Sequence, residues 1–226
     1  MFINIINMPE NQLYHTAQPE SIQTGGYTEY NNIDFVLNVG EGRSLVKNSV
    51  RINGDLYING TTNNVRAAAA DQVYLGNKIG IHNVVDSCQV SFSGGPNSGL
   101  KENIANYARF AEMIAVGQLY TDDLLNCSNM CELRAVNNTA SQLNSMGVPT
   151  GALALGSTVA TRDVDFSFKP HCILNRMTGD DLSIDKTGEI RLTINLARSV
   201  AALMGYSQDS VTTYTLKNLH CSYISV

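Results

Sequence analysis

Hydrophobic and polar residues alternate along several short stretches of this chain. The clearest stretch is 190–196, in which Ile190, Leu192 and Ile194 are separated by single polar residues. Successive side chains of a strand point to opposite faces, so a period of two predicts a strand that buries one face. Similar patterns predict strands over 33–39, 50–58, 73–75, 79–92, 164–168 and 171–174, and a last strand of mixed phase over 212–226. The phase of 79–92 changes near Val84 to Asp86, which predicts a bulge or bend there.

These segments amount to about eight strands in two groups of four, placed on either side of a helical stretch. Their alternation argues against a parallel sheet, because strands of such a sheet are buried on both faces and read as continuously apolar. We therefore expect an all-β fold, an eight-stranded antiparallel jelly-roll β-sandwich with a helical insertion. The side chains expected between its sheets are those of Ile52, Leu56, Phe166, Ile190, Leu192 and Ile194.

The pattern becomes helical from about 97 to 145. Apolar residues recur there at spacings of three and four, the periodicity of a helix with one buried face. They are Ile104, Tyr107, Ala108, Ala111, Ile114 and Ala115. Ser98 is placed to cap the start of the first helix, Glu102 to complement its dipole, and Gly117 to end it.

The N-terminal stretch is polar and contains Pro9, Pro19 and the pair Gly25–Gly26. It predicts an extended N-terminal arm over 1–28, followed by a single jelly-roll domain over 29–226. The arm nevertheless begins with strongly apolar residues, which are Phe2, Ile3, Ile5 and Ile6. Since exposed apolar side chains are costly, we expect this assembly arm to dock on a neighbouring protein subunit as an added strand.

Charged residues make up only 15% of the chain, so Asn, Ser, Thr and Gln must supply much of the surface. Uncharged polar groups are cheaper to desolvate than charges, which suits permanent contact with protein neighbours, and a neutral soluble surface is the equally weighted alternative. The net charge of −5 and the lack of a basic run argue against direct binding of nucleic acid. No apolar run reaches the roughly 18 residues of a membrane span, and the N-terminus lacks the regions of a secretory signal.

The five cysteines are scattered and odd in number, which argues against a disulfide framework and indicates a reducing compartment. Cys127 and Cys131 stand four residues apart, but no His or Cys pair follows at zinc-ligand spacing. His82 and His171 lie on separate predicted strands. We interpret both as structural, and the alternative is that they meet in space in a metal or catalytic site.

Acidic residues also gather at Asp180, Asp181 and Asp185, where we expect a solvated loop and keep a calcium site as the alternative. The adjacent carboxylates of Asp122 and Asp123 diverge on a helix and form no acid–base couple. We predict no catalytic residue, no metal and no cofactor, and hence a protein that is not an enzyme.

The order of several segments resembles that of jelly-roll capsid proteins of the tectivirus–adenovirus lineage. The segments are NIDFVLNVGEGRSLVKNSVRINGDLYI, NKIGIHNVVDSCQVSFSGG, LKENIANYARFAEMIAVGQLYTDDLLN and the closing strands from DFSFKPHCILNRM onward. The resemblance covers roughly Ile33 to Val226 and implies a structural virion protein that assembles into an icosahedral shell or its vertices. Major capsid proteins of that lineage contain two rolls, and 226 residues supply strands for one. The resemblance thus implies a penton-type or minor capsid protein, or the first roll of a longer one.

The partners implied are further copies of the chain, as a pentamer or trimer, and other capsid proteins. The implied location is the virion, after assembly in a reducing host cell compartment. The alternative function is a β-sandwich binding module that recognises a receptor or carbohydrate through Tyr57, Tyr74, Tyr120 and Tyr206. The lack of Trp weakens that alternative, because indole rings are frequent anchors.

Overall fold

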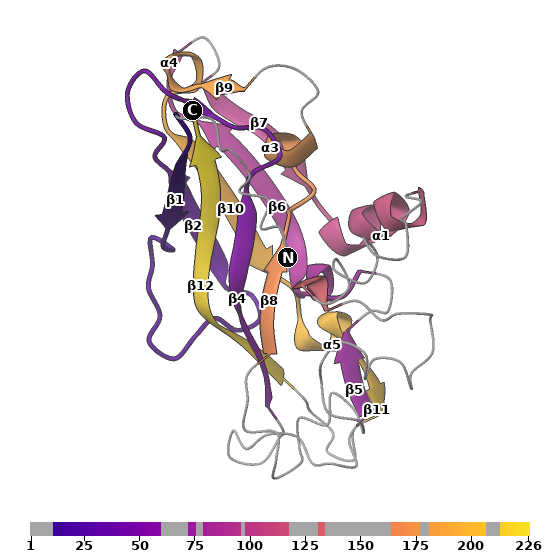
Figure 1. Ribbon diagram of the computed structural model, residues 1–226. Helices are drawn as coiled ribbons and strands as arrows, with labels where there is room; N and C mark the ends of the chain where they lie inside the picture. The colour runs from indigo at the N-terminus through magenta and orange to yellow at the C-terminus, as the bar shows by residue number, and fades with distance from the viewer. Residues whose placement is uncertain are drawn as a thin grey trace, which may run out of the picture.

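The computed structural model describes residues 11–59, 72–75, 79–95, 98–117, 131–133, 164–176, 181–206 and 213–226. Two antiparallel sheets dominate this part of the chain and pack face to face, with short helices between the strands (Figure 1). The expected all-β sandwich is therefore confirmed. None of the helices in the described ranges is long and apolar enough to cross a membrane.

The first sheet is centred on β12, the long C-terminal strand. Its strand order is β8-β4-β12-β3-β9. Strand β1 pairs with the side of β12 that faces away from β4. The strands are β1 (Leu13–Ala17), β3 (Ser44–Leu45), β4 (Arg51–Asn59), β8 (Val164–Phe168), β9 (Leu182–Ser183) and β12 (Thr213–Ser225).

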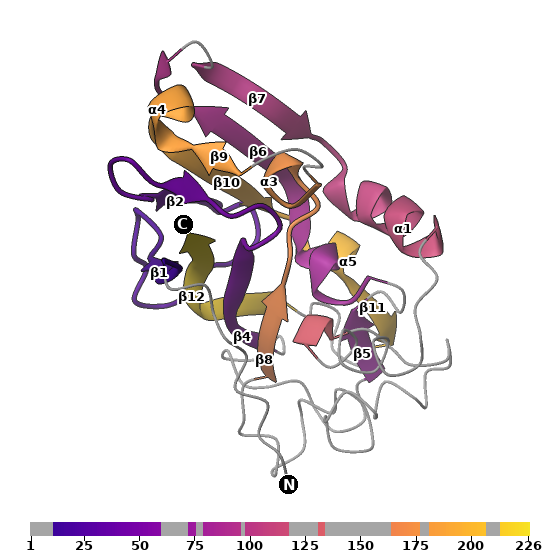
Figure 2. The same ribbon diagram turned by 45° about the horizontal axis from the view of Figure 1, so that its top comes forward.

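The second sheet has the order β2-β10-β6-β7, so β2 and β7 are its edges. Its strands are β2 (Asn32–Leu37), β6 (Val85–Phe92), β7 (Gly99–Ile104) and β10 (Ile190–Leu196). A separate ribbon joins β5 (Gln72–Leu75) to β11 (Leu203–Tyr206). The helical segments are η1 (Ile81–Val84), α1 (Tyr107–Gly117), α3 (Ile173–Arg176), α4 (Ile184–Thr187) and α5 (Ser199–Ala202). Figure 2 shows β7 at the outer margin of its sheet and α1 projecting beyond it.

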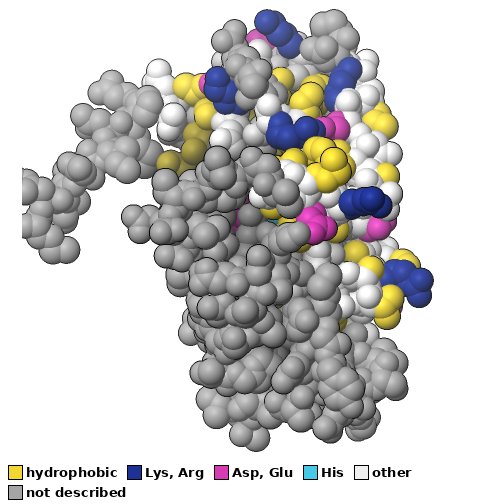
Figure 3. All heavy atoms as spheres, turned by 90° about the vertical axis from the view of Figure 1, so that its right-hand side faces the viewer, with side chains coloured by type: hydrophobic (Ala, Val, Ile, Leu, Met, Phe, Trp, Pro, Cys, Tyr) yellow, Lys and Arg dark blue, Asp and Glu magenta, His cyan; other side chains and the backbone are white. Residues whose placement is uncertain are grey.

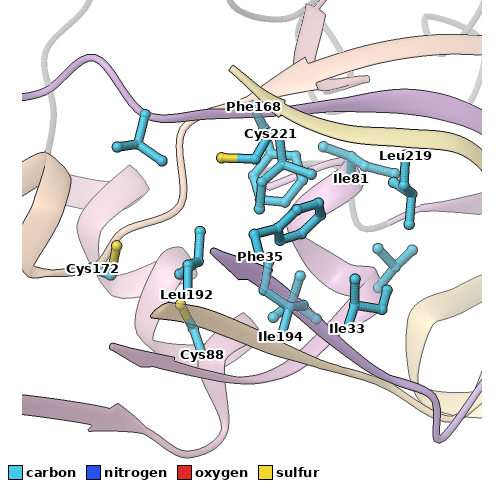
Figure 4. Packing of buried hydrophobic residues seen from close by; sticks show 14 of the residues in the cluster. Ile33, Phe35, Ile81, Cys88, Phe168, Cys172, Leu192, Ile194, Leu219 and Cys221 are labelled. Atoms are coloured by element: carbon cyan, nitrogen blue, oxygen red, sulfur yellow. The ribbon is translucent and has the colours of Figure 1, made fainter. Parts of the chain in front are cut away.

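The core lies between the two sheets. All six side chains predicted for this position are buried, none more than 4% exposed. Phe35 of β2 points from one sheet toward Phe168 and Cys221 of the other, with Leu192 and Ile194 beside it in its own sheet (Figure 4). The alternation of β10 thus produces the expected result, with every second side chain in the core.

Two predicted elements were wrong. Residues 99–104, assigned to the start of a helix, form strand β7 and pair with β6. Gly99 has a φ of 101°, and the glycine-rich turn before it lets the chain fold back along β6, where strand pairing satisfies the backbone of both strands. The helix begins only at Tyr107. The strand expected over 171–174 is absent from the described structure. Residues 173–176 form the short helix α3 after Pro170, because the Cys172 carbonyl accepts the amide hydrogen bonds of Asn175 and Arg176.

A third prediction was correct in part. The chain bends near Val84 as expected, but the strand expected over 79–92 begins only at Val85, because Ile81–Val84 form the 3-10 turn η1. After β10 the chain forms the short helix α5.

Residues 11–28 of the expected arm lie on the sandwich of their own chain. Strand β1 pairs along its whole length with β12. Tyr27 is only 4% exposed, and its backbone exchanges two hydrogen bonds with Leu216, of 2.8 and 2.7 Å. Phe2, Ile3, Ile5 and Ile6 lie outside the described residues, so their docking stays a prediction.

Candidate assembly surface

The outward side of the β2-β10-β6-β7 sheet carries a row of small uncharged polar side chains on its two central strands. We call this row the polar face; it consists of Ser87, Gln89, Ser91, Thr193 and Asn195. Its members alternate with buried apolar residues and face one another in register across β6 and β10. All five are partly exposed. The core alternation therefore leaves a flat polar strip on the opposite side of the same two strands.

Hydrogen bonds across the strands fix several side chains of this strip. The Nδ2 atom of Asn195 donates to Ser87 Oγ at 2.7 Å, and the Thr193 hydroxyl donates to the carboxylate of Asp34 on β2. Side chains that already bond to their neighbours lose little conformational entropy when a partner covers them. Uncharged donors and acceptors also cost less to desolvate than charges. The polar face therefore meets two physical requirements of a lasting protein contact.

Besides Asp34, which accepts the hydrogen bond of Thr193, charges stand at one end of the polar face. Arg191 forms ion pairs with Glu20 and, at 3.4 Å, with Glu189. The hydrogen bond that Arg191 donates to the Glu20 carboxylate raises the pKa of Arg191. Because these groups are largely exposed, their pairing contributes little to stability and serves mainly to neutralise the margin of the face.

The outward side of the other sheet is more charged. Arg51 donates through Nε to Ser167 Oγ at 2.9 Å, and the Lys217 ammonium lies 4.3 Å from the ring centroid of Tyr57. Asp55 and Asp165 stand directly opposite each other on β4 and β8. Like charges in this position repel, and a partner covering them would have to desolvate both. Of the two outward sheet faces, the polar face is the one that a neighbour can cover at lower cost.

Strand β7 gives the polar face an open edge. Leu100 is 60% exposed, and no described strand pairs with the far side of β7. Glu102 accepts hydrogen bonds from the Ile173 amide and from Arg176, which ties β7 to α3. Figure 3 views the side on which α1 projects and shows basic, acidic and apolar side chains interspersed there.

The structure brings His82 and His171 together. A metal or catalytic site, the alternative to two structural histidines, would require this proximity. Their rings stack with centroids 4.7 Å apart and planes 8° from parallel. The Nδ1 atom of His82 lies 2.9 Å from the Tyr107 hydroxyl, and its Nε2 atom lies 3.7 Å from Glu132. Among the described residues, no group of three or more His, Cys, Asp or Glu side chains is arranged to hold a metal ion.

Those of the remaining candidate residues that the structure describes do not converge on one site. Asp181 accepts a 2.9 Å hydrogen bond from the Lys47 amide, and Asp185 lies in α4, whereas Asp180 lies outside the described ranges. Of the four candidate tyrosines, the structure describes the side chain of Tyr57 alone. Tyr120 and the Asp122–Asp123 pair are also outside the described part of the chain.

Sequence reasoning did not single out the polar face, although its signal was present. The non-core positions of 85–92 and 190–196 are the alternate residues of two predicted strands. The sequence shows that few of these positions are charged. It does not show the register that aligns the two distant segments side by side.

No protein-family model matches the sequence, and no curated protein matches it. Among solved structures, the chain is similar to the PBCV-1 virus capsid, with a TM-score of 0.50 and 12% identity over 99% of this chain and 44% of that one. It is also similar to the Faustovirus major capsid protein, with a TM-score of 0.53 and 11% identity over 99% of this chain and 56% of that one. The chain thus spans about half the length of these neighbours. At this identity the likeness concerns the fold alone, and the chain shares the β-sandwich fold of these two structures.

Proposed function

We propose that this chain is a structural virion protein, a jelly-roll capsid subunit that assembles into an icosahedral shell or its vertices. The observation that carries the proposal is the likeness of 99% of the chain to two viral capsid structures. The function consists of buried interface rather than chemical turnover, so it requires no catalytic residue and no cofactor. The proposal places the protein in the virion.

The strand order supports the proposal in finer detail. The strands β1-β12-β4-β8 face the strands β2-β10-β6-β7. Eight strands in two facing sheets, with the last strand in the middle of one and the next-to-last long strand in the middle of the other, match a jelly roll. On this assignment β3, β9 and the β5–β11 ribbon are additions to an eight-stranded roll.

Two forms of the proposal remain. The chain is either a penton-type or minor capsid protein with a single roll, or the first roll of a double jelly-roll capsid protein. The share of the neighbours that it covers, 44% and 56%, is what one roll of a two-roll protein would give. The first form predicts a pentamer of this chain, and the second predicts a trimer of the two-roll protein.

Free thiols agree with assembly in a reducing compartment. Cys88, Cys172 and Cys221 are buried and unlinked. Burial raises the pKa of Cys221, and the hydrogen bond with Cys172 followed by burial raises that of Cys88. Both thiols therefore stay protonated and serve as small core side chains.

We expect native mass spectrometry of the purified chain to show a closed oligomer or a larger assembly. Gln89→Lys places a charge at the centre of the polar face and should shift the population toward monomer, because the charge must be desolvated on contact. Gln23→Lys adds the same charge in the exposed loop beside β12 and is the control. Retention of wild-type assembly by Gln89→Lys would remove the polar face from the interface. A monomer at all concentrations for the wild-type chain would count against the single-roll form of the capsid function.

The second proposed contact is the assembly arm, whose apolar residues Phe2, Ile3, Ile5 and Ile6 dock on a neighbour. Because β1 and Tyr27 belong to the sandwich, the test is a deletion of residues 1–10 rather than of 1–28. The short deletion should leave the melting temperature nearly unchanged and weaken assembly in the same mass measurement. The deletion of 1–28 should lower the melting temperature, since it removes a strand of the sheet. If the short deletion alone unfolds the chain, the arm is part of the roll.

The alternative of a receptor- or carbohydrate-binding module has one observation in its favour. A hollow of about 280 Å³ lies between the loop over 18–27 and β12, with Ile22, Tyr27 and Lys217 among its lining residues. A monomer in the mass measurement would favour this function over the capsid subunit.

A further inference from the structure

The stacked histidines join three parts of the fold. His82 lies in η1 and is fully buried, His171 follows β8, and Tyr107 is the first residue of α1. The Tyr107 hydroxyl oxygen accepts a 2.9 Å hydrogen bond from the backbone amide of His171 and lies 2.9 Å from His82 Nδ1. Phe168 packs edge-on against the His82 ring at 4.8 Å. The position of α1 on the sandwich therefore depends on this cluster.

The hydrogen bonds favour one tautomer of His82. Burial raises the pKa of Tyr107 well above its ordinary value, so the hydroxyl keeps its hydrogen. Because the oxygen already accepts from the His171 amide, its own hydrogen is available to His82 Nδ1. The hydrogen of the neutral imidazole then sits on Nε2, 3.7 Å from the Glu132 carboxylate. If one of the two histidines gains a proton, the nearby Glu132 carboxylate stabilises that first positive charge.

Several other titratable groups face the cluster. Cys88 on β6 and Cys172 before α3 lie close enough to act on the Tyr107 hydroxyl. Lys169, at the end of β8, interacts with Glu132; burial lowers the pKa of Lys169, and Arg51 lowers it further. Glu132 forms an ion pair with His82 at 3.7 Å when that ring is protonated. Its carboxylate carries one negative charge, whereas each of the two imidazole rings can become positive.

We propose that the His82–His171 stack is an acid-responsive contact that holds α1 and η1 on the sandwich while the pair carries at most one proton. Two nearly parallel imidazolium rings with centroids 4.7 Å apart repel each other strongly when one of them, His82, is fully buried. The unfolded chain accepts a proton on each ring near pH 6.5. The folded chain thus binds fewer protons than the unfolded one below that pH. Stability is fully present above pH 6.5 and is lost as the pH falls through it. This inference goes beyond the capsid function and holds for a monomer as well.

The test is urea unfolding of the full chain at pH 7.5, 6.0 and 5.0. For one proton of difference, the unfolding equilibrium constant rises by up to about tenfold per pH unit below pH 6.5. His171→Phe retains a stacking ring without a titratable group and should remove about one proton from this dependence. His171→Gln is the second variant and carries the same expectation if the Phe variant folds poorly. His15 remains in every variant; its pKa is lowered by burial and then by Arg43, so its contribution cancels.

His220→Asn removes a histidine from β12, outside the cluster, and should keep the wild-type pH dependence. Hydrogen exchange of the wild-type chain gives an independent measurement. Between pH 7.5 and 5.0, after correction for intrinsic rates, the amides of α1 should lose protection before those of β12. The same pH dependence in wild type and the His171 variants, or equal loss of protection in α1 and β12, would overturn the proposal.

Discussion

Leu192→Ala is expected to lower the free energy of unfolding by about 2–5 kcal/mol. Leu192 is fully buried, and its neighbours in register are Phe35 on β2 and Val90 on β6. Three strands of one sheet thus meet at this side chain, with the other sheet above it. Truncation leaves a cavity that the paired backbones cannot close, so both the transfer free energy and the cavity term are lost.

The measurement is urea unfolding of wild type and variant, with both slopes compared. Met113→Ala is the matched control, because Met113 is also a large apolar side chain but is 70% exposed on α1. Its truncation should change the free energy of unfolding by less than about 0.5 kcal/mol. A loss below roughly 1 kcal/mol for Leu192→Ala would mean that β10 does not lie in the core.

Alternation alone was sufficient to predict the strands with one buried face. In β10 the period of two runs without interruption, and all its alternate apolar residues are buried. The period of β7 was misread for a physical reason. Leu100 and Ile104 lie four residues apart, a helical spacing, but β7 is an edge strand that is mostly exposed. An edge strand has little need to bury a face, so backbone pairing with β6 determines its structure rather than side-chain pattern.

The sequence pattern did not predict which distant segments lie side by side. The polar face requires β6 to pair with β10 in a register that sets Gln89 opposite Thr193. The histidine stack requires η1 and the end of β8 to pack on α1. Both are products of sheet order, which the local pattern does not contain. Local periodicity thus predicts which side of a strand is free, whereas topology determines what the free sides form together.

The loop contact at the top of the sandwich also depends on topology. Gly188, after α4, has a φ of 63° and a ψ of −148°, a backbone conformation that is essentially limited to glycine. A Cβ atom added there would lie 2.6 Å from the Gly94 nitrogen and 2.7 Å from its Cα. The neighbouring Gly94 amide donates a 3.0 Å hydrogen bond to the Thr187 carbonyl. Two backbones therefore touch where the β6–β7 turn crosses the start of β10.

Gly188→Ala is expected to cost about 2–6 kcal/mol, because backbone strain of about 1–3 kcal/mol adds to an overpacking cost of similar size. Two other glycines separate these contributions. Gly42 has a φ of 70° but open space around it, so Gly42→Ala should show the strain alone, about 1–2 kcal/mol. Gly25 has neither feature, and Gly25→Ala should stay within about 1 kcal/mol of wild type. Denaturant unfolding of the three variants gives the ranking. If Gly188→Ala costs no more than Gly42→Ala, the turn and the strand do not touch in solution, and the pairing of β6 with β10 ends before Phe92.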